Sequence, residues 1–289
     1  MALWGSSFAI LRSLMGDAAA SPLALVSVRM AIASALLLGY MAATASGRAQ
    51  LRSLRSRLLR DGVFVGSLLG IGFLLQIEGL QRTTASRSGF LTGTLVVLTP
   101  LIDFAVYRKR PALPALIGVL LAFIGMTVLS SPWSDASQAT ALGDALTLGC
   151  AVVFAAHIVA LGRVAKKYPV LPMLLLQLVT TAALAALAGP LVEAQHFSGT
   201  PRLWLALMYL AVFATLLAFG IQTWAQRILT PVRVALISSL EPVFAALWAA
   251  LLIGERLTLR EVLGGALIVI GVAVGEAGAA LRARARAPG

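Results

Sequence analysis

The chain has 289 residues and a formal net charge of +12, with 60% hydrophobic and only 12% charged residues. A soluble globular domain has about 45–50% apolar and about 25% charged residues, so this composition excludes an ordinary soluble protein. The one cysteine, Cys150, excludes a disulfide framework within the chain.

Ten apolar stretches follow one another along the chain. A run of about 20 apolar residues, coiled as a helix, matches a hydrocarbon layer of about 30 Å, and backbone in lipid must form helices or closed barrels. The first stretch is short, but no positively charged segment precedes it, so we expect a true helix rather than a signal peptide. The predicted spans are 2–15, 21–43, 61–82, 85–107, 112–130, 141–165, 170–191, 202–226, 231–253 and 259–280.

Basic residues between the spans predict the orientation. Most of them face the cytoplasm if both termini are placed there, as the positive-inside rule requires of an inner-membrane protein. The longest polar loop, 44–60, is the most basic, and we expect Arg52, Arg55 and Arg60 on one face of a short surface helix beside anionic lipid. The net charge is therefore interpreted as a topology signal, and no nucleic acid is expected as a partner.

The second half of the sequence repeats the first. A shift of 146 residues places Phe73, Gln76, Arg87, Gly118 and Gly125 on Phe219, Gln222, Arg233, Gly264 and Gly271. A shift of 150 places Trp4 on Phe154, and Pro100 and Pro242 depart from the register by four residues. Five helices are an odd number, so the second unit must enter the membrane from the opposite side. The sequence predicts an all-α integral membrane protein with ten transmembrane helices in two inverted five-helix repeats, 1–130 and 141–281.

Several motifs are distributed along essentially the whole chain. They are Trp4-Gly5-Ser6-Ser7-Phe8, Thr84-Ala85-Ser86-Arg87, Glu241-Pro242-Val243-Phe244-Ala245 with Gly254-Glu255-Arg256-Leu257-Thr258, and Gly264 to Gly271. In these motifs the chain resembles the EamA-type branch of the drug/metabolite transporter superfamily, which implies export of amino acids, metabolites or drugs. One departure is that Arg108-Lys109-Arg110-Pro111 stands where the second half has Gly254-Glu255-Arg256-Leu257.

Glu241 is the strongest candidate for a functional side chain. It lies about ten residues into a predicted span and directly precedes Pro242. An ionisable group at that depth costs several kcal/mol, roughly 2.5–3.5 on insertion scales, and marks a functional site by default. The proline leaves the carbonyl one turn back without its helical hydrogen bond. A carboxyl group beside such a disrupted turn is expected to carry a proton or bind a cation. The alternative is a structural carboxyl group that pairs with the backbone or with hydroxyls such as those of Ser238 and Ser239.

Arg29 is the other charged candidate, because it lies within the second predicted span. It would recognise a solute carboxylate, pair with Glu78 or Glu241, or act as a structural clamp, and the clamp is slightly favoured. Glu78 itself precedes Arg82 by four residues, the spacing of a surface ion pair.

Neutral polar and aromatic residues complete the predicted site. Gln76 and Gln222 are equivalent in the repeat, so together they would present amide donors and acceptors to a polar solute, or else bond helices together. His157 is a candidate proton carrier, although a lone histidine on an apolar helix is more often structural. Trp4 would line a cavity, and Ser7 belongs to the same motif.

The leading functional interpretation is a secondary transporter that works by alternating access. It takes a small-molecule substrate, with a proton or counter-solute and membrane lipid as further partners, and a homodimer is allowed for. The alternatives are a passive channel or an intramembrane enzyme, which the missing nucleophile–base pair disfavours. No cofactor or metal is expected, because no phosphate-binding Gly-Lys-Ser loop or His-Glu-x-x-His helix occurs.

Overall fold

The computed structural model describes residues 1–6, 10, 20–52, 54–108, 110–131, 140–194, 196–254 and 256–285. Within these ranges the regular structure is helical, apart from an isolated antiparallel bridge between Ala20 and Phe197. Nine helical segments of this part are long and apolar enough to cross a membrane. The prediction of an all-helical, multi-pass membrane protein is confirmed. Of the predicted span 2–15, residues 2–6 and Ile10 are helical, and the rest lies outside the described ranges.

The helices follow one another with short connections, and two turns are irregular. The first half contains α2 (Pro22–Ala43), α3 (Ala45–Arg52), α4 (Ser56–Leu80), α5 (Ala85–Gly93), α6 (Leu95–Tyr107) and α7 (Leu113–Ser130). The second half contains α8 (Ala141–Val164), the 3₁₀ turn η2 (Ala165–Lys167), α9 (Val170–Val192), α10 (Pro201–Tyr209), the π-helical η3 (Leu210–Leu217), α11 (Ala218–Ile228), α12 (Pro231–Ser238), α13 (Glu241–Ile253) and α14 (Leu259–Ala285).

Threonine N-caps start four of these helices. In each, the threonine hydroxyl accepts a hydrogen bond from the backbone N–H three residues later, which satisfies one of the free donors of the first turn. α13 ends at Gly254, whose φ of 73° is a left-handed conformation that glycine adopts without penalty. The capping threonines are Thr84, Thr140, Thr200 and Thr230.

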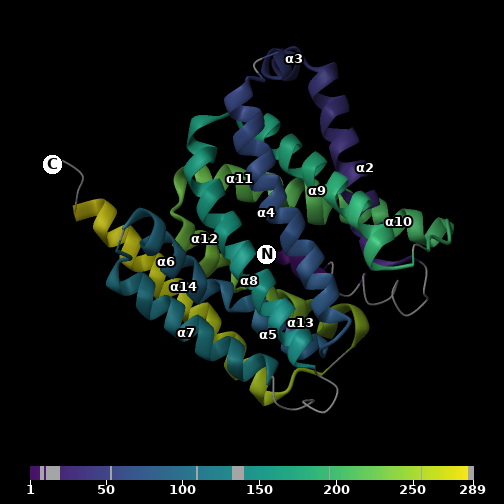
Figure 1. Cartoon of the computed structure of the whole chain (residues 1–289). Coiled ribbons are helices and arrows are strands. Elements are labelled where there is room, and N and C mark those ends of the chain that lie inside the picture. The colour runs from purple at the N-terminus through teal and green to yellow at the C-terminus, as the bar shows by residue number, and fades with distance from the viewer. Residues whose placement is uncertain are drawn as a thin grey trace.

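The basic segment 44–60 differs from the expectation. α3 is a short helix that ends at Arg52, but Arg55 precedes α4 and Arg60 lies within it. The prediction that Arg52, Arg55 and Arg60 share one face of one helix is therefore wrong. In Figure 1, α3 lies at the upper end of the molecule between α2 and α4, so the arginines are divided between two separate helices.

The two halves of the sequence interlock rather than forming separate bodies. Among the most extensive helix contacts are those of α2 with α9, of α4 with α8 and α9, and of α7 with α14. Each of these joins the first half to the second. In Figure 1, α7 and α14 lie side by side along one flank, and α2, α4 and α9 form the opposite part of the molecule.

The crossing of α7 and α14 depends on four glycines. A Cβ added at Gly118 would lie 2.5 Å from the carbonyl oxygen of Gly271, and one added at Gly271 would lie 2.6 Å from that of Gly118. Gly125 and Gly264 are in the same reciprocal relation, at 2.6 and 2.7 Å. Gly118 faces Gly271, and Gly125, further along α7, faces Gly264, which comes earlier in α14. The two helices therefore run antiparallel. Only residues without a side chain allow the backbones to approach so closely.

Two helices are interrupted at equivalent points of the sequence. α5 gives way to α6 at Thr94, and α12 gives way to α13 at Ser239–Leu240. A shift of 146 residues takes Thr94 to Leu240. The disrupted turn expected beside Glu241 is found directly before Pro242, and Pro242 itself lies in the first turn of α13, where a missing N–H costs no intrahelical bond.

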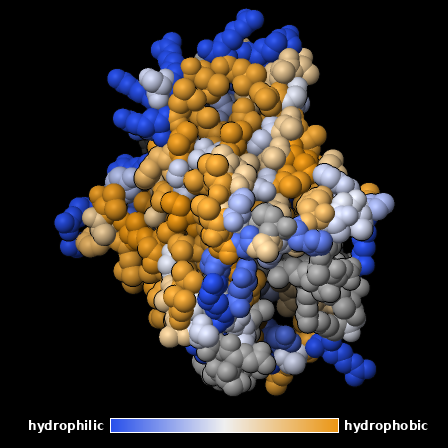
Figure 2. Space-filling model, turned by 45° about the vertical axis from the view of Figure 1, so that its right-hand side comes forward, coloured by the Kyte–Doolittle hydropathy of each residue, from blue (hydrophilic) through white to orange (hydrophobic). Residues whose placement is uncertain are grey.

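Apolar side chains dominate the outer surface, and basic ones collect at the ends. Figure 2 shows hydrophobic residues across the body of the molecule and hydrophilic side chains extending from its upper end. A continuous apolar surface of this size on a helical bundle fits contact with lipid. Strongly exposed examples on three helices are Leu187, Leu191, Leu205 and Leu251.

Candidate functional site

Glu241 lies directly after the interruption between α12 and α13. It is the first residue of α13 and is half-buried. No described side chain forms a hydrogen bond or ion pair with its carboxylate, which interacts electrostatically with the amino group of Met1. The Ser238 and Ser239 hydroxyls donate instead to the carbonyls of Val234 and Leu236, at 2.9 and 2.6 Å. Pairing of Glu241 with these hydroxyls is therefore wrong, and the carboxylate is left at the positive end of a helix dipole.

Arg29 is buried in α2, where 7% of its surface is exposed. Its guanidinium carbon lies 5.4 Å from the centroid of the Phe73 ring, which is the geometry of a cation–π contact. The Nε atom is buried without a hydrogen-bond partner, and no described carboxylate pairs with the group. Glu78 pairs with Arg82, as the spacing of four residues predicts. The Arg29–Glu78 and Arg29–Glu241 pairs offered by the sequence are not formed.

An aromatic chain runs through the centre from one half of the sequence to the other. Trp4 packs edge-on against Phe219 at 5.1 Å, Phe219 against Phe73 at 6.3 Å, and Phe73 against Phe154 at 5.6 Å, measured between ring centroids. Under the repeat, Phe73 is equivalent to Phe219 and Trp4 to Phe154. The Trp4–Phe219 contact is therefore equivalent to the Phe154–Phe73 contact. The Phe73–Phe219 contact between them joins two residues that are equivalent to each other.

Trp4 also connects the first helical segment to the irregular turn of the second half. Its indole Nε1–H donates to the carbonyl of Ala214, at 2.8 Å, within the π-helical η3. A π-helical turn leaves carbonyls free for such bonds and often marks a functional site. Thr215, the next residue in η3, is fully buried and its hydroxyl has no partner among the described groups.

The first segment also touches the turn that carries Glu241. A Cβ added at Gly5 would lie 2.8 Å from the backbone nitrogen of Ala245 and from Cβ of Phe244. Trp248 of α13 donates to the carbonyl of Ala2, at 3.0 Å. The motif containing Trp4 and Gly5 thus lies against α13 about one turn beyond Glu241. Ser7, predicted from the same motif, lies outside the described residues.

The two glutamines of the repeat are placed on the elements that carry the aromatic chain. Gln76 follows Phe73 by three residues in α4 and is half-buried, and Gln222 follows Phe219 by three residues in α11. Gln222 is 7% exposed, and its Oε1 atom has no hydrogen-bond partner among the described groups. A buried acceptor left unpaired costs about 1–3 kcal/mol, which a solute donor would recover.

His157 belongs to a closed hydrogen-bond network of the second half. Its Nε2 lies 2.9 Å from Oε1 of Gln177, whose Nε2 donates to the Thr223 hydroxyl at 3.3 Å and to the Met173 carbonyl. His157 is 2% exposed. This geometry fits the structural alternative, since the imidazole already has a buried partner. Gln177 was not among the predicted site residues, although a glutamine in an apolar helix is a usable signal.

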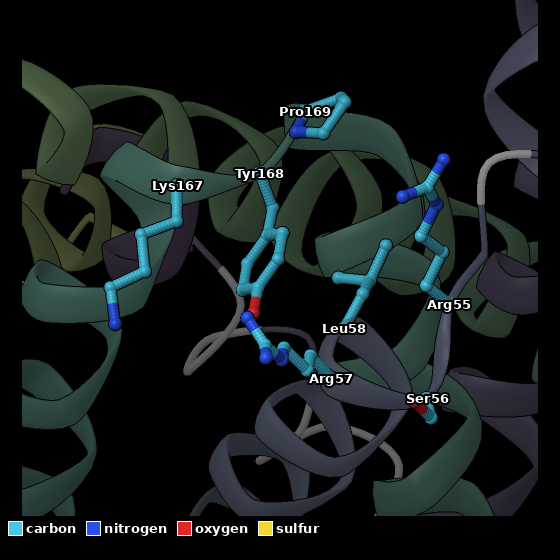
Figure 3. A pocket seen from close by; sticks show the side chains of 7 residues that line it. All are labelled: Arg55, Ser56, Arg57, Leu58, Lys167, Tyr168 and Pro169. Atoms are coloured by element: carbon cyan, nitrogen blue, oxygen red, sulfur yellow. The ribbon is translucent and has the colours of Figure 1, made fainter.

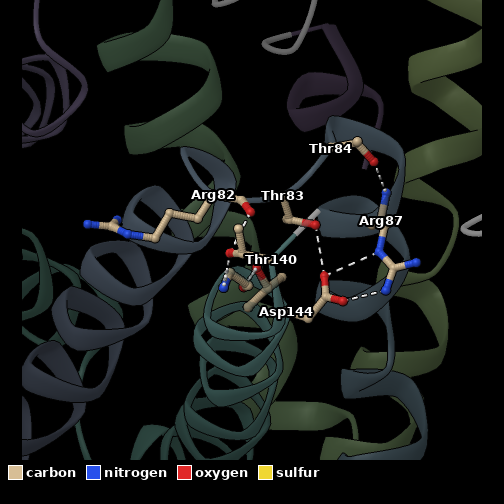
Figure 4. Close-up of polar contacts among 8 residues, drawn as sticks. Arg82, Thr83, Thr84, Arg87, Thr140 and Asp144 are labelled. Carbon is tan, nitrogen blue, oxygen red and sulfur yellow. Dashed lines mark hydrogen bonds and ion pairs between the residues drawn. The ribbon is translucent and has the colours of Figure 1, made fainter. Parts of the chain in front are cut away.

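A polar cluster joins the halves at one end of the bundle (Figure 4). Asp144 at the start of α8 forms an ion pair with Arg87 of α5 and accepts a hydrogen bond from Thr83 at 2.8 Å. The Thr140 hydroxyl and N–H both donate to the carbonyl of Arg82, at 2.9 and 3.0 Å. The sequence analysis assigned no role to Asp144. Arg233, the equivalent of Arg87, pairs instead with Glu276 of α14, within its own half.

The site thus combines a buried cation, a carboxylate, amides and aromatic rings. The groups are connected by contacts: Arg29 lies over Phe73, Phe73 leads through Phe219 to Trp4, and the Trp4 segment abuts α13. Groups of these kinds are suited to binding a polar organic solute. In the described ranges, no three His, Cys, Asp or Glu side chains converge as metal ligands.

Comparisons with known proteins agree with this architecture. An uncharacterized transporter of Archaeoglobus fulgidus is 31% identical over 274 residues, covering 94% of this chain and 82% of that protein. The uncharacterized inner membrane transporter YicL of Salmonella typhimurium is 28% identical, covering 98% and 94%. A protein of the same organism named "Probable amino-acid metabolite efflux pump" is 29% identical over 203 residues, covering 64% of each chain.

The fold and the family are also matched directly. A crystal structure superposes with a TM-score of 0.80 at 21% identity, covering 94% of this chain and 93% of the other. The names of the three relatives above are those of transporters rather than enzymes. The EamA-like transporter family matches residues 1–131 and again 141–274. The chain therefore belongs to the EamA-like transporter family of multi-pass membrane proteins.

Proposed function

We propose that this protein is a secondary active transporter that exports small organic solutes, such as amino acids, metabolites or drugs, across the cytoplasmic membrane. It works by alternating access between two inverted five-helix repeats, 1–130 and 141–281, with both termini in the cytoplasm. The ten-helix count includes the segment that begins at residue 2. The solute occupies the central site, and Glu241 couples its movement to a proton or a counter-solute.

One observation carries the proposal: the two halves contact each other through pairs of residues, and each pair has an equivalent pair under the sequence repeat. The Gly118–Gly271 contact maps onto Gly264–Gly125, as expected for a two-fold axis perpendicular to the antiparallel α7 and α14. The aromatic chain has the same property. An axis perpendicular to membrane-spanning helices lies in the membrane plane, and this supports inverted topology.

Inverted repeats give alternating access a physical basis. If each half can adopt the shape of the other, exchanging the two shapes opens the central site to the opposite side. Ion pairs at the ends of the bundle then differ between the two states. The Arg87–Asp144 pair joins the halves at one end, so we expect it to break when that end opens.

The chemistry of the site favours a solute that carries both a negatively charged carboxylate and a positively charged ammonium group. Arg29 would bind a carboxylate, because a guanidinium offers several directed donors. The Gln76 and Gln222 amides suit polar groups, and the Trp4 and Phe219 rings suit an apolar side chain or an ammonium group. An amino acid has all of these features, and one relative is named an amino-acid metabolite efflux pump.

Counterflow in liposomes tests the proposal. Purified protein is reconstituted with excess unlabelled amino acids inside, and uptake of each labelled amino acid is followed. A transporter accumulates label transiently above equilibrium, whereas a passive channel shows no such overshoot and an enzyme changes the solute chemically. Absence of overshoot for amino acids and for a broad metabolite and drug panel contradicts the proposal.

The orientation has a separate test. Ser46 is exposed on α3, whereas the native Cys150 is fully buried, so an impermeant maleimide will report on a Ser46→Cys thiol alone. We expect labelling only after the cells are opened. Labelling from outside intact cells would reverse the proposed topology.

A further inference from the structure

A basic cavity of about 620 Å³ lies away from the central site, between the start of α4 and the link from η2 to α9. It joins the two halves of the sequence, because α4 belongs to the first and α9 to the second. Figure 3 shows its wall from close by, with the Arg57 guanidinium beside the Tyr168 hydroxyl. The lining residues are Arg55, Ser56, Arg57, Leu58, Lys167, Tyr168 and Pro169.

The charge of this cavity is positive and uncompensated. Arg55, Arg57 and Lys167 are exposed, and none of them forms an ion pair with a described residue. The nearby Asp61 carboxylate is already engaged, by Arg60 at 3.2 Å and by the Tyr168 hydroxyl at 2.9 Å. Burial and the hydrogen bond to Asp61 raise the pKa of Tyr168, so its phenol remains a donor. The lining therefore presents three cations and no acid.

Two long helices begin at the same cavity. Arg55 is the N-cap of the 25-residue α4, and Pro169 is the N-cap of the 23-residue α9. Neither N-cap side chain accepts a hydrogen bond from its helix. No side chain in the described part of the chain accepts a hydrogen bond from the first N–H groups of α4 or from those of Val170 and Leu171 in α9, and both dipoles present their positive ends. Cations together with free backbone N–H groups form a strong site for a phosphate group.

The surroundings favour a phosphate attached to a lipid. α4 crosses the membrane, and just beyond the cavity it exposes Leu59, Val63 and Phe64, by 42%, 44% and 57%. These side chains offer an apolar surface to an acyl chain whose headgroup lies one or two turns nearer the end of the helix. We propose that this cavity binds the phosphodiester headgroup of an anionic phospholipid and thereby tethers α4 to α9.

Native mass spectrometry of the full chain in detergent tests this inference. Dioleoylphosphatidylglycerol is titrated, and the Kd of the first lipid adduct is measured for the wild type and for an Arg57→Gln, Lys167→Gln double variant. Each cation near a membrane surface changes binding by about fivefold, so we expect the double variant to bind roughly thirtyfold more weakly. Both residues are exposed, so the fold should be retained.

A matched control distinguishes a specific site from general attraction. Lys166 and Arg227 line a separate cavity of about 300 Å³, and Lys166→Gln with Arg227→Gln removes the same charge. We expect this variant to bind the lipid nearly as tightly as the wild type. Equal losses in the two variants would overturn the proposal, because the basic surface as a whole would then attract the lipid.

Two other ligands test the headgroup and the tail. Dioleoylphosphatidylcholine has the same acyl chains without net charge, and we expect weaker binding, since the three cations gain nothing from a neutral headgroup. Glycerol 3-phosphate and inorganic phosphate carry the anion without acyl chains. If either competes with the lipid at comparable concentration, the cavity is a site for soluble phosphate and the lipid assignment is wrong.

Discussion

Arg29 allows the central site to be tested energetically. Arg29 is the eighth residue of the 22-residue α2, and a charged arginine within a membrane helix costs up to roughly 2.5–3.5 kcal/mol, the value at the helix centre on insertion scales. The contact with the face of Phe73 returns about 1–2 kcal/mol when it is desolvated. In the absence of a carboxylate partner among the described residues, the difference of the order of 1–2 kcal/mol is a cost that the solute-free protein bears.

Arg29→Met separates binding from folding. Methionine keeps the length and the contact with Phe73 but removes the charge. We expect the free energy of unfolding to stay the same or to rise by about 1 kcal/mol, because an uncompensated buried charge is lost. A hydrogen bond to a charged group contributes about 1.5–3 kcal/mol, so we expect a carboxylate solute to bind about 10- to 100-fold more weakly.

Thermal unfolding in detergent measures the stability, and the concentration dependence of counterflow measures the affinity. Arg82→Met is the matched control, since Arg82 is already paired with Glu78 and is more exposed. We expect it to leave the affinity unchanged. If Arg29→Met lowers the stability by more than about 2 kcal/mol while the affinity is retained, Arg29 is a structural clamp and the binding role is refuted.

Three further predictions concern the coupling group, the helix crossing and the aromatic chain. Glu241→Gln should abolish uptake driven by a pH gradient but retain counterflow, and a normal pH-driven flux in this variant would end the proton-carrier idea. Gly125→Ala should lower the free energy of unfolding by about 1–3 kcal/mol, because its Cβ would lie 2.6 Å from the Gly264 carbonyl oxygen. Gly39→Ala, with open space around it, is the control and should be neutral. Double-mutant cycles on Trp4–Phe219 and Phe73–Phe154 should give similar coupling energies of about 0.5–1.5 kcal/mol, and a coupling confined to one pair would contradict the equivalence of the two contacts.

The sequence predicted the membrane helices well, because their signal is local. Span length and apolar composition are read directly from the chain, and nine spans appear in the described ranges. The Glu78–Arg82 pair was likewise predicted from spacing alone, since both residues lie on one helix face. The division of the basic segment between α3 and α4 was missed, because the sequence between Arg52 and Ser56 contains neither proline nor glycine.

Partners of buried polar groups were harder to predict, because they depend on which helices become neighbours. The bond between His157 and Gln177 joins α8 to α9, and the sequence contains no spacing rule for such a pair. The interruption before Pro242, by contrast, was predicted from the sequence, because a proline lacks the backbone N–H that the preceding turn needs.

The contacts that have an equivalent in the other half, which are the glycine crossing of α7 and α14 and the aromatic chain, are apolar. The charged groups of the centre, Arg29 and Glu241, have no charged equivalent. The register shift of four at Pro242 places Glu241 opposite Thr99, which is fully buried and donates to the Leu95 carbonyl. Replacement of a carboxylate by a satisfied hydroxyl costs nothing in packing but removes a titratable group. The apolar contacts can therefore support an exchange of shapes between the halves, while the recognition proposed for Arg29 and the coupling proposed for Glu241 each depend on a charged side chain that has no charged equivalent in the other half. On this reasoning, Thr99→Val should leave coupled uptake intact. Loss of pH-driven flux in that variant, at normal expression and stability, would show that coupling is shared by both halves.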